Sequence, residues 1–330
     1  MAGLTWHGYA RGMPLLEPSR ATEQQQLHEA KVNSRCWGGI FCLVCFCISL
    51  AFLHGMRGLP AGAWAVLPAR PVPRRMMAGQ AMKYAMLNYE DGAYLKEIHN
   101  ARALERTDMF THGFELHPHV SAVRDWHSPE EVSQVYYPEI ENIVKRITGA
   151  TFTVCGRHVL RGSDFETSGN YLPFQRVHND YADTFGDDVI QTFASCKNNF
   201  MRDAGITKTM LQDSRIVMIN CWRSIRPEPV QGFPLTVVDK RTVRTDELET
   251  AERAGPGSLT YVSKYSPWHT FYYFPEMTSE EVLLFRTFDS GEKPFQPTLH
   301  TAFMDGSAPT EAVPRRSCDV RVFCLLPTHA

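Results

Sequence analysis

The stretch VHNDY, residues 177–181, decides how the rest of the chain is interpreted. On a β-strand, residues two apart project to the same face, so His178 and Asp180 can bind one ion while the residue between them points away. His300 supplies a second imidazole about 120 residues downstream, inside the apolar stretch 299–303, whose β-branched and aromatic residues favour a strand. Two imidazoles and one carboxylate suit non-haem iron(II) and leave coordination positions open. The sequence therefore predicts an iron(II) site formed by these three side chains.

A second polar motif lies between His300 and the C-terminus. Arg315 and Ser317 form an Arg-x-Ser pair that precedes an alternating strand, 318–324. On an extended chain the guanidinium and the hydroxyl share one face, where they can hold a carboxylate through parallel hydrogen bonds. Arg321 has the same strand parity as Arg315 and is a rival for this role. For either arginine the plainer explanation is an exposed side chain on a closing strand.

A series of stretches in the same order carries a family resemblance: HGFEL 112–116, YYPEI 136–140, TGA 148–150, VHNDY 177–181, NCWR 220–223, Pro234-Leu235 with Asp239, and 285–303. From about Met82 onward the chain resembles the iron/2-oxoglutarate hydroxylase/desaturase family that includes the fungal gibberellin desaturase and the cephem methoxylase small component. The resemblance implies a mainly β fold with flanking helices around a double-stranded β-helix (jelly-roll) core. It also implies an oxygenase that uses iron(II), 2-oxoglutarate and O2 to hydroxylate or desaturate a small secondary metabolite. The aromatic cluster 271–274 favours an apolar metabolite, although ordinary core packing is the plainer explanation of this cluster.

The resemblance further assigns roles to single residues. It implies that Arg315 and Ser317 bind 2-oxoglutarate, and that Asn220, Trp222 and Arg223 line the substrate pocket. Arg316 departs from the family pattern, which has an acidic residue at this position. This departure motivates the alternative of a noncatalytic binding or partner subunit that keeps the oxygenase fold.

Composition agrees with one large domain. The chain has 330 residues and 43% hydrophobic content, which is enough for a substantial core. A net charge of -2 and the lack of a basic cluster interleaved with aromatic residues give no reason to expect nucleic acid as a partner. The sequence contains no Gly-x-Ser-x-Gly elbow, Walker A loop or GxGxxG fingerprint, so hydrolase and nucleotide chemistry have little support.

The N-terminal part differs from this domain. A polar segment, 1–35, precedes an uncharged apolar run, 36–53, whose 18 residues would reach about 27 Å as a helix, just enough for a bilayer core. A Pro/Arg-rich linker, 54–81, then leads to the oxygenase-like domain, 82–330. We expect a single membrane anchor with the catalytic domain facing the cytosol, where ferrous iron and 2-oxoglutarate are available. A cytoplasmic protein is expected instead if translation begins near Met76, Met77 or Met82.

The pattern of the domain predicts one long helix and about eight strands. Ser128 is a predicted N-cap, Pro129 is at the first helical position, and Gly149 can end the helix. The segment 187–210 also favours helix. The predicted strands are 152–160, 215–222, 235–239, 258–262, 270–274, 282–288, 298–303 and 318–326. Short strands with Pro and Gly breaks fit a jelly-roll barrel.

Other histidines offer weaker alternatives for a metal site. His112, His117 and His119 are close in sequence, but their spacing is not a regular helical or strand arrangement. His158 alternates with apolar neighbours and fits a histidine at the edge of the core. His269 is a weaker rival to His300.

Overall fold

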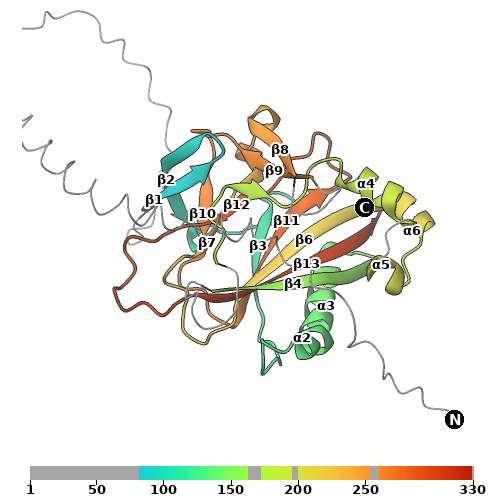
Figure 1. Ribbon diagram of the computed structural model, residues 1–330, viewed down its shortest axis with the longest axis horizontal. Coiled ribbons are helices and arrows are strands. Elements are labelled where there is room, and N and C mark those ends of the chain that lie inside the picture. Colours follow the sequence, from blue (N-terminus) through green and yellow to red (C-terminus); the bar gives the residue numbers. More distant parts are fainter. Residues whose placement is uncertain (1–81, 163–171, 195–199, 253–258, 329–330) are drawn as a thin grey trace, which may run out of the picture. The chain divides into compact units, whose positions relative to one another are not determined.

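The structure is a computed structural model that describes residues 82–162, 172–194, 200–252 and 259–328 (Figure 1). The predicted segments 1–35, 36–53 and 54–81 lie outside these residues. Within the described ranges, no helix has the length and apolar character needed to span a bilayer. The described chain folds into two β-sheets flanked by short helices.

The larger sheet carries the predicted metal ligands. Its eight strands pair antiparallel except β2 with β10, which pair in parallel. Their spatial order is β1 (Lys83–Tyr89), β2 (Gly92–Asn100), β10 (Phe271–Tyr273), β7 (Leu235–Val238), β12 (His300–Ala302), β5 (His178–Asn179), β9 (Leu259–Ser263) and β8 (Leu248–Glu252). Strands β12 and β5 are central neighbours, which brings distant parts of the sequence together.

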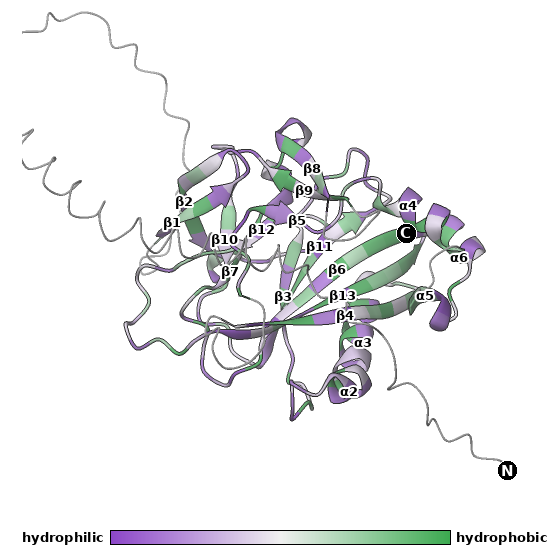
Figure 2. Ribbon diagram, in the orientation of Figure 1, coloured by the Kyte–Doolittle hydropathy of each residue, from purple (hydrophilic) through white to green (hydrophobic). Residues whose placement is uncertain are grey.

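The smaller sheet contains five antiparallel strands: β3 (Phe114–Pro118), β11 (Glu281–Asp289), β6 (Ser214–Ser224), β13 (Arg316–Pro327) and β4 (Phe152–Gly162). Figure 2 shows that β6 and β13 are hydrophobic along much of their length. Side chains of β13 alternate between two faces. Val320 and Val322 pack in the core cluster that also contains Ile140 and Val144 of the helical layer, whereas Asp319 and Arg321 line a pocket on the other face.

The predicted long helix is present but is not uniform. It comprises α2 (Pro129–Glu131), a π-helical turn η2 (Val132–Tyr136) and α3 (Tyr137–Thr148). Ser128 caps it by accepting a hydrogen bond from the Glu131 backbone N–H, and Gly149 ends it at φ 69°. Pro138 has no N–H, and in a regular α-helix its ring would collide with the carbonyl four residues earlier, which explains the wide turn.

The predicted helical segment 187–210 is divided into shorter pieces. These are α4 (Phe185–Thr192), α5 (Phe200–Asp203) and α6 (Lys208–Gln212), with a left-handed Gly205 after α5. They pack through Val189, Met201 and Leu211 against one end of the barrel core. Three single turns of 3-10 helix complete the structure: η1 (Ala101–Ala103), η3 (Lys240–Thr242) and η4 (Thr245–Glu247).

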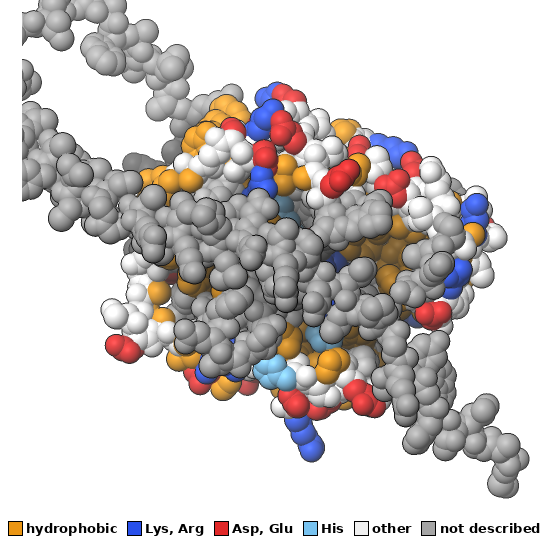
Figure 3. Space-filling view, viewed as in Figure 1, with side chains coloured by type: hydrophobic (Ala, Val, Ile, Leu, Met, Phe, Trp, Pro, Cys, Tyr) orange, Lys and Arg blue, Asp and Glu red, His pale blue; other side chains and the backbone are white. Residues whose placement is uncertain are grey.

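The mainly β fold is confirmed, and each of the eight predicted strands is present within two residues of its predicted bounds. The sequence prediction omitted β1, β2, β3 and β8. Strands β1 and β2 form a hairpin whose turn is Glu90-Asp91, and Gly92, the first residue of β2, has a positive φ of 148° that favours glycine. Hydrophobic side chains reach the surface over this hairpin in Figure 3, where Tyr84, Met86 and Leu95 are exposed.

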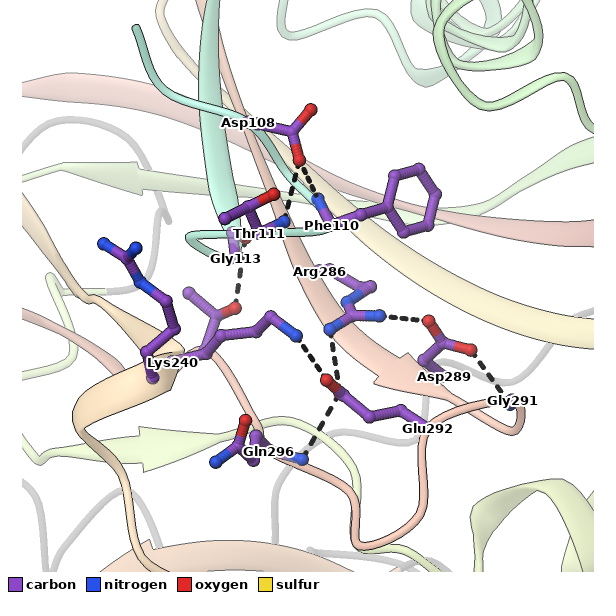
Figure 4. Close-up of polar contacts among 12 residues, drawn as sticks. Asp108, Phe110, Thr111, Gly113, Lys240, Arg286, Asp289, Gly291, Glu292 and Gln296 are labelled. Atoms are coloured by element: carbon purple, nitrogen blue, oxygen red, sulfur yellow. Dashed lines mark hydrogen bonds and ion pairs between the residues drawn. The ribbon is translucent and has the colours of Figure 1, made fainter.

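A buried charged network lies beside the strand that leads toward His300 (Figure 4). Asp289 accepts two hydrogen bonds of 2.7 Å from Arg215 and also pairs with Arg286. Glu292 accepts a 2.8 Å hydrogen bond from Arg286 and pairs with Lys240. Burial opposes ionisation of Asp289, but the hydrogen bonds from Arg215 and the charge of Arg286 lower its pKa. The network therefore holds an ionised carboxylate in the interior.

Replacing Asp289 with asparagine is expected to destabilise the fold by about 3–5 kcal/mol, because the half-buried guanidinium of Arg215 loses its carboxylate partner and the buried guanidinium of Arg286 loses one of its two. The lowered pKa means that this stabilisation is present at neutral pH and is lost as pH falls below about 4. Chemical denaturation at pH 7 measures the effect. Asp246→Asn removes the exposed partner of Arg244 and should leave the denaturation midpoint unchanged. Equal midpoints for the two variants would contradict the prediction.

Candidate metal centre and cosubstrate pocket

The two predicted histidine ligands lie directly opposite each other. His178 on β5 is the antiparallel partner of His300 on β12, and the centroids of their rings are 4.2 Å apart. Asp180 follows β5 directly and places a carboxylate oxygen 3.9 Å from Nε2 of His178. One candidate ligand atom from each of the three side chains lies within 4.8 Å of the others. Within the part of the chain that the structure describes, this is the one such group of histidine, cysteine and acidic residues.

Backbone carbonyls orient both imidazoles. Nδ1 of His178 is 2.8 Å from the Arg176 carbonyl, and Nδ1 of His300 is 3.2 Å from the Thr298 carbonyl. A carbonyl oxygen only accepts, so each Nδ1 carries the proton and each Nε2 keeps its lone pair for a metal. Burial lowers the pKa of both rings, and His300 lowers that of His178 further. Both histidines are therefore in the neutral form that a metal requires.

The carboxylate of Asp180 is held by two donors from the smaller sheet. Arg321 donates from Nε to Oδ2 at 2.9 Å and from Nη2 to Oδ1 at 3.2 Å. Asn220 donates to Oδ2 at 2.6 Å. Arg321 and Asn220 are register partners on β13 and β6, so one cross-strand pair of residues holds the Asp180 carboxylate. With oriented neutral imidazoles and a held carboxylate, the donor set fits iron(II).

Arg315 lines another part of the same pocket, and Ser317 contacts it. Both are buried, and Nε of Arg315 donates to the Ser317 hydroxyl at 3.1 Å. Nη1 of Arg315 donates to the Phe233 carbonyl at 2.6 Å, and its guanidinium carbon is 5.0 Å from the centre of the Trp222 ring. Burial and then the charge of Arg161 lower the pKa of Arg315 to about 9. Two cations in a buried pocket favour an anionic ligand such as a carboxylate.

The three residues predicted to line the substrate pocket lie on two different faces of β6. Trp222 lines the pocket with Leu235 and Phe285, and Asn220 contacts Asp180 beside it. Arg223, one residue further along β6, is placed on the opposite face. Its guanidinium carbon lies 5.3 Å from the centre of the Trp126 ring. The structure thus brings Asn220 and Trp222 to the site but does not bring Arg223 there.

The other histidines are engaged away from the triad. His112 accepts a hydrogen bond from the Asp108 backbone, and His119 contacts Arg223. His158 pairs with the Tyr137 hydroxyl at 2.9 Å, and Nε2 of His269 is 3.0 Å from Glu247. Among the described residues, these side chains join no group that is suited to a metal ion.

Gly113 supports His300 through Thr298, a connection that sequence reasoning missed. The Thr298 hydroxyl donates to the Gly113 carbonyl at 3.0 Å, while the Thr298 carbonyl accepts from His300. Gly113 has φ 97°, and a β-carbon added there would overlap the Thr298 hydroxyl. Any larger residue at this position must therefore displace the residue that orients His300.

Gly113→Ala is accordingly expected to weaken metal binding by about 10–100-fold, the usual effect of disturbing the support of a metal ligand. Anaerobic titration with iron(II) measures the change. Gly149→Ala is the matched control, because Gly149 also has positive φ, 69°, but a β-carbon there would meet nothing within 4 Å. Equal iron affinities in the two variants would contradict the prediction, because the overlap with Thr298 would then have no specific effect on metal binding.

Comparisons with known proteins bear on this site. The family described as "Oxidoreductase/YMDC permease-like domain" matches residues 69–325. The Fe(II)/2-oxoglutarate-dependent dioxygenase nvfI of Aspergillus novofumigatus (strain IBT 16806) is 29% identical over 249 residues, covering 69% of this chain and 81% of the relative. The alpha-ketoglutarate-dependent dioxygenase phiK of Fungal sp. (strain ATCC 74256) is 30% identical over 184 residues, covering 52% and 62%.

A solved structure agrees with these relatives. The iron and alpha-ketoglutarate-dependent endoperoxidase NvfI superimposes with a TM-score of 0.60 at 25% identity. The match covers 75% of this chain and 98% of the solved one. The predicted jelly-roll core is therefore confirmed.

Proposed function

We propose, from the premise that the chain belongs to the oxidoreductase/YMDC permease-like domain family, that His178, Asp180 and His300 bind iron(II) for an oxygenase reaction. The chain is a non-haem iron(II)/2-oxoglutarate-dependent dioxygenase, as its relatives are named, and its cofactors are iron(II), 2-oxoglutarate and O2. The observation that carries the assignment of ligands is the convergence of three candidate ligand atoms within 4.8 Å. The particular likeness to the gibberellin desaturase stays a prediction.

We assign 2-oxoglutarate to the part of the pocket that contains Arg315 and Ser317. Arg315 presents a guanidinium beside a hydroxyl, and this pair suits the distal carboxylate of a dicarboxylic acid. The rival, Arg321, makes a two-point contact with Asp180, so its position supports the metal ligand rather than the cosubstrate. Arg315 is therefore the proposed cosubstrate arginine.

The chain's own residues position and shield the reaction. Iron(II) and 2-oxoglutarate, when bound, supply the oxidation of a substrate C–H bond by dioxygen with release of succinate and carbon dioxide. Arg176 and Thr298 hold the imidazoles through their carbonyls, and Asn220 holds the carboxylate. The Phe174 ring stands edge-on to His178, with centroids 4.5 Å apart, and shields this ligand from water.

The substrate we propose is a small, mainly apolar metabolite that is hydroxylated or desaturated. Phe174, Leu235 and Phe285 provide apolar walls, and Trp222 provides an aromatic one. The alternative of a noncatalytic partner subunit is not favoured, because the relatives are named as dioxygenases.

The deciding experiment is anaerobic titration of the full chain with iron(II) and 2-oxoglutarate, following the weak visible charge-transfer band of the complex. We expect a saturable band and iron-dependent succinate formation in air. Asp180→Ala should lose both. A folded protein that binds iron and forms neither the band nor succinate would refute the catalytic assignment.

Membrane attachment through residues 36–53, with the domain 82–330 on the cytosolic side, is a separate proposal that rests on sequence alone. Fractionation of cells expressing the full chain tests it. Full-length protein is expected to stay in the membrane fraction after alkaline extraction. A chain that lacks 36–53 should appear in the supernatant. Release of both proteins would refute the anchor and leave the oxygenase assignment unaffected.

A further inference from the structure

We propose that Arg321 is a positioning residue that sets the charge at the iron ligand Asp180 and thereby keeps bound iron in the ferrous state. This inference rests on the proposed function, because it requires iron at the triad. It assigns to Arg321 a role distinct from cosubstrate binding.

The geometry of the contact is that of a strong ion pair. The planar guanidinium meets the carboxylate through Nε and Nη2, at 2.9 and 3.2 Å. The Asp180 side chain is 5% exposed and that of Arg321 is 15% exposed, so little water screens the pair. At neutral pH a guanidinium keeps its proton, so Arg321 carries a fixed positive charge. Asp180 is therefore a ligand whose charge is partly balanced before any metal arrives.

The carboxylate receives two kinds of support on the same oxygen. Oδ2 accepts from the neutral amide of Asn220 at 2.6 Å and from the charged Nε of Arg321. Oδ1 is the oxygen that lies 3.9 Å from Nε2 of His178, so it faces the other ligands. Asn220 supplies orientation without charge, whereas Arg321 supplies orientation and charge. This difference allows the two contributions to be separated by mutation.

A fixed cation beside a metal ligand has two electrostatic consequences. It weakens the attraction of the site for any divalent ion, because like charges repel strongly where water is excluded. It also disfavours oxidation, because iron(II) that gives one electron to dioxygen becomes iron(III) and adds a positive charge to the site. Removing the cation should therefore strengthen metal binding and accelerate oxidation. Loss of a purely structural contact would weaken metal binding instead.

Asp319 provides the opposite charge in the same pocket. Its Oδ2 lies 3.8 Å from Nη2 of Arg321, and it is the cross-strand partner of Trp222. In its ionised form, this carboxylate offsets part of the Arg321 charge. Replacing Asp319 with asparagine should therefore shift metal affinity and oxidation rate in the opposite direction to removal of Arg321.

The test compares Arg321→Met with Asn220→Ala. Affinity is measured with zinc(II), which has no redox chemistry, and the rate at which the iron(II) protein oxidises is measured in air-saturated buffer without substrate. We expect Arg321→Met to oxidise about 10-fold faster and to bind zinc at least as tightly as the unmodified chain. Asn220→Ala should bind zinc about 10-fold more weakly and oxidise at the unmodified rate.

Arg321→Lys keeps the charge and should restore slow oxidation. If Arg321→Met does not fold, as judged by circular dichroism, Asp319→Asn tests the same effect with opposite sign: slower oxidation and weaker zinc binding. The inference is overturned if Arg321→Met loses zinc affinity as Asn220→Ala does, or if Asp319→Asn changes neither quantity. Failure of the unmodified chain to bind iron would instead refute the proposed function, so the two failures are distinguishable.

Discussion

His300→Ala is expected to abolish iron-dependent succinate formation and to weaken iron binding by more than about 100-fold, beyond the effect usual for a residue that only supports a ligand. The imidazole of His300 is the ligand that we propose β12 contributes, and its Nδ1 is already hydrogen-bonded to the Thr298 carbonyl. Its removal leaves a two-ligand site that holds a divalent ion poorly. Iron content after anaerobic loading and gel filtration measures the loss.

His158→Ala is the matched control for this result. His158 is another partly buried histidine on a strand, and burial lowers its pKa as well, but its partner is Tyr137. The control should retain iron and activity. Iron retention by His300→Ala at the level of His158→Ala would remove His300 from the metal site and return attention to the other histidines.

Arg315→Leu is expected to raise the Kd for 2-oxoglutarate at least ~30-fold while leaving iron affinity unchanged. Removing one member of a buried charge pair typically costs about 2–5 kcal/mol, and each 1.4 kcal/mol is a factor of ten. Titration of the iron-loaded protein with 2-oxoglutarate, followed through the charge-transfer band, gives the Kd. A variant with unchanged 2-oxoglutarate affinity would contradict the assignment.

Arg316→Leu is the neighbouring control. Arg316 begins β13, and strand alternation places it on the opposite face from Arg315 and Ser317. Its removal should not change the affinity for 2-oxoglutarate. If both variants lost 2-oxoglutarate equally, a general effect of positive charge would replace specific recognition by Arg315.

The strands and the His178–Asp180 pair were predictable because they depend on local patterns, whereas the identity of the three residues as iron ligands stays a prediction. Continuous apolar runs mark β6 and β11, alternation marks β13, and His-x-Asp places two side chains on one strand face. Strand β5 has only two residues, too few for any periodicity, so its motif was the only available signal. The hairpin of β1 and β2 also has a local sequence signal, the glycine at position 92 directly after its turn.

The supporting residues were less predictable because strand register decides them. Arg321 faces Asn220 across two antiparallel strands about 100 residues apart, and no local pattern reports this pairing. The sequence did, however, contain evidence against placing Arg223 in the pocket. Once β6 continues to Ser224, alternation places Asn220 and Trp222 on one face and Arg223 on the other. The support of His300 by Gly113 depends on a loop contact that sequence periodicity does not reveal.

The brevity of β5 has a consequence for how long the protein survives in a cell. A single residue pair, His178 with His300, joins β5 to β12 in the middle of the larger sheet. Bound iron would link β5 to β12. Free iron at 100 times its Kd would stabilise the folded state by about 2.7 kcal/mol. Degradation in cells often follows the small population of opened molecules. The supply of iron is therefore expected to set the abundance of this protein as well as its activity.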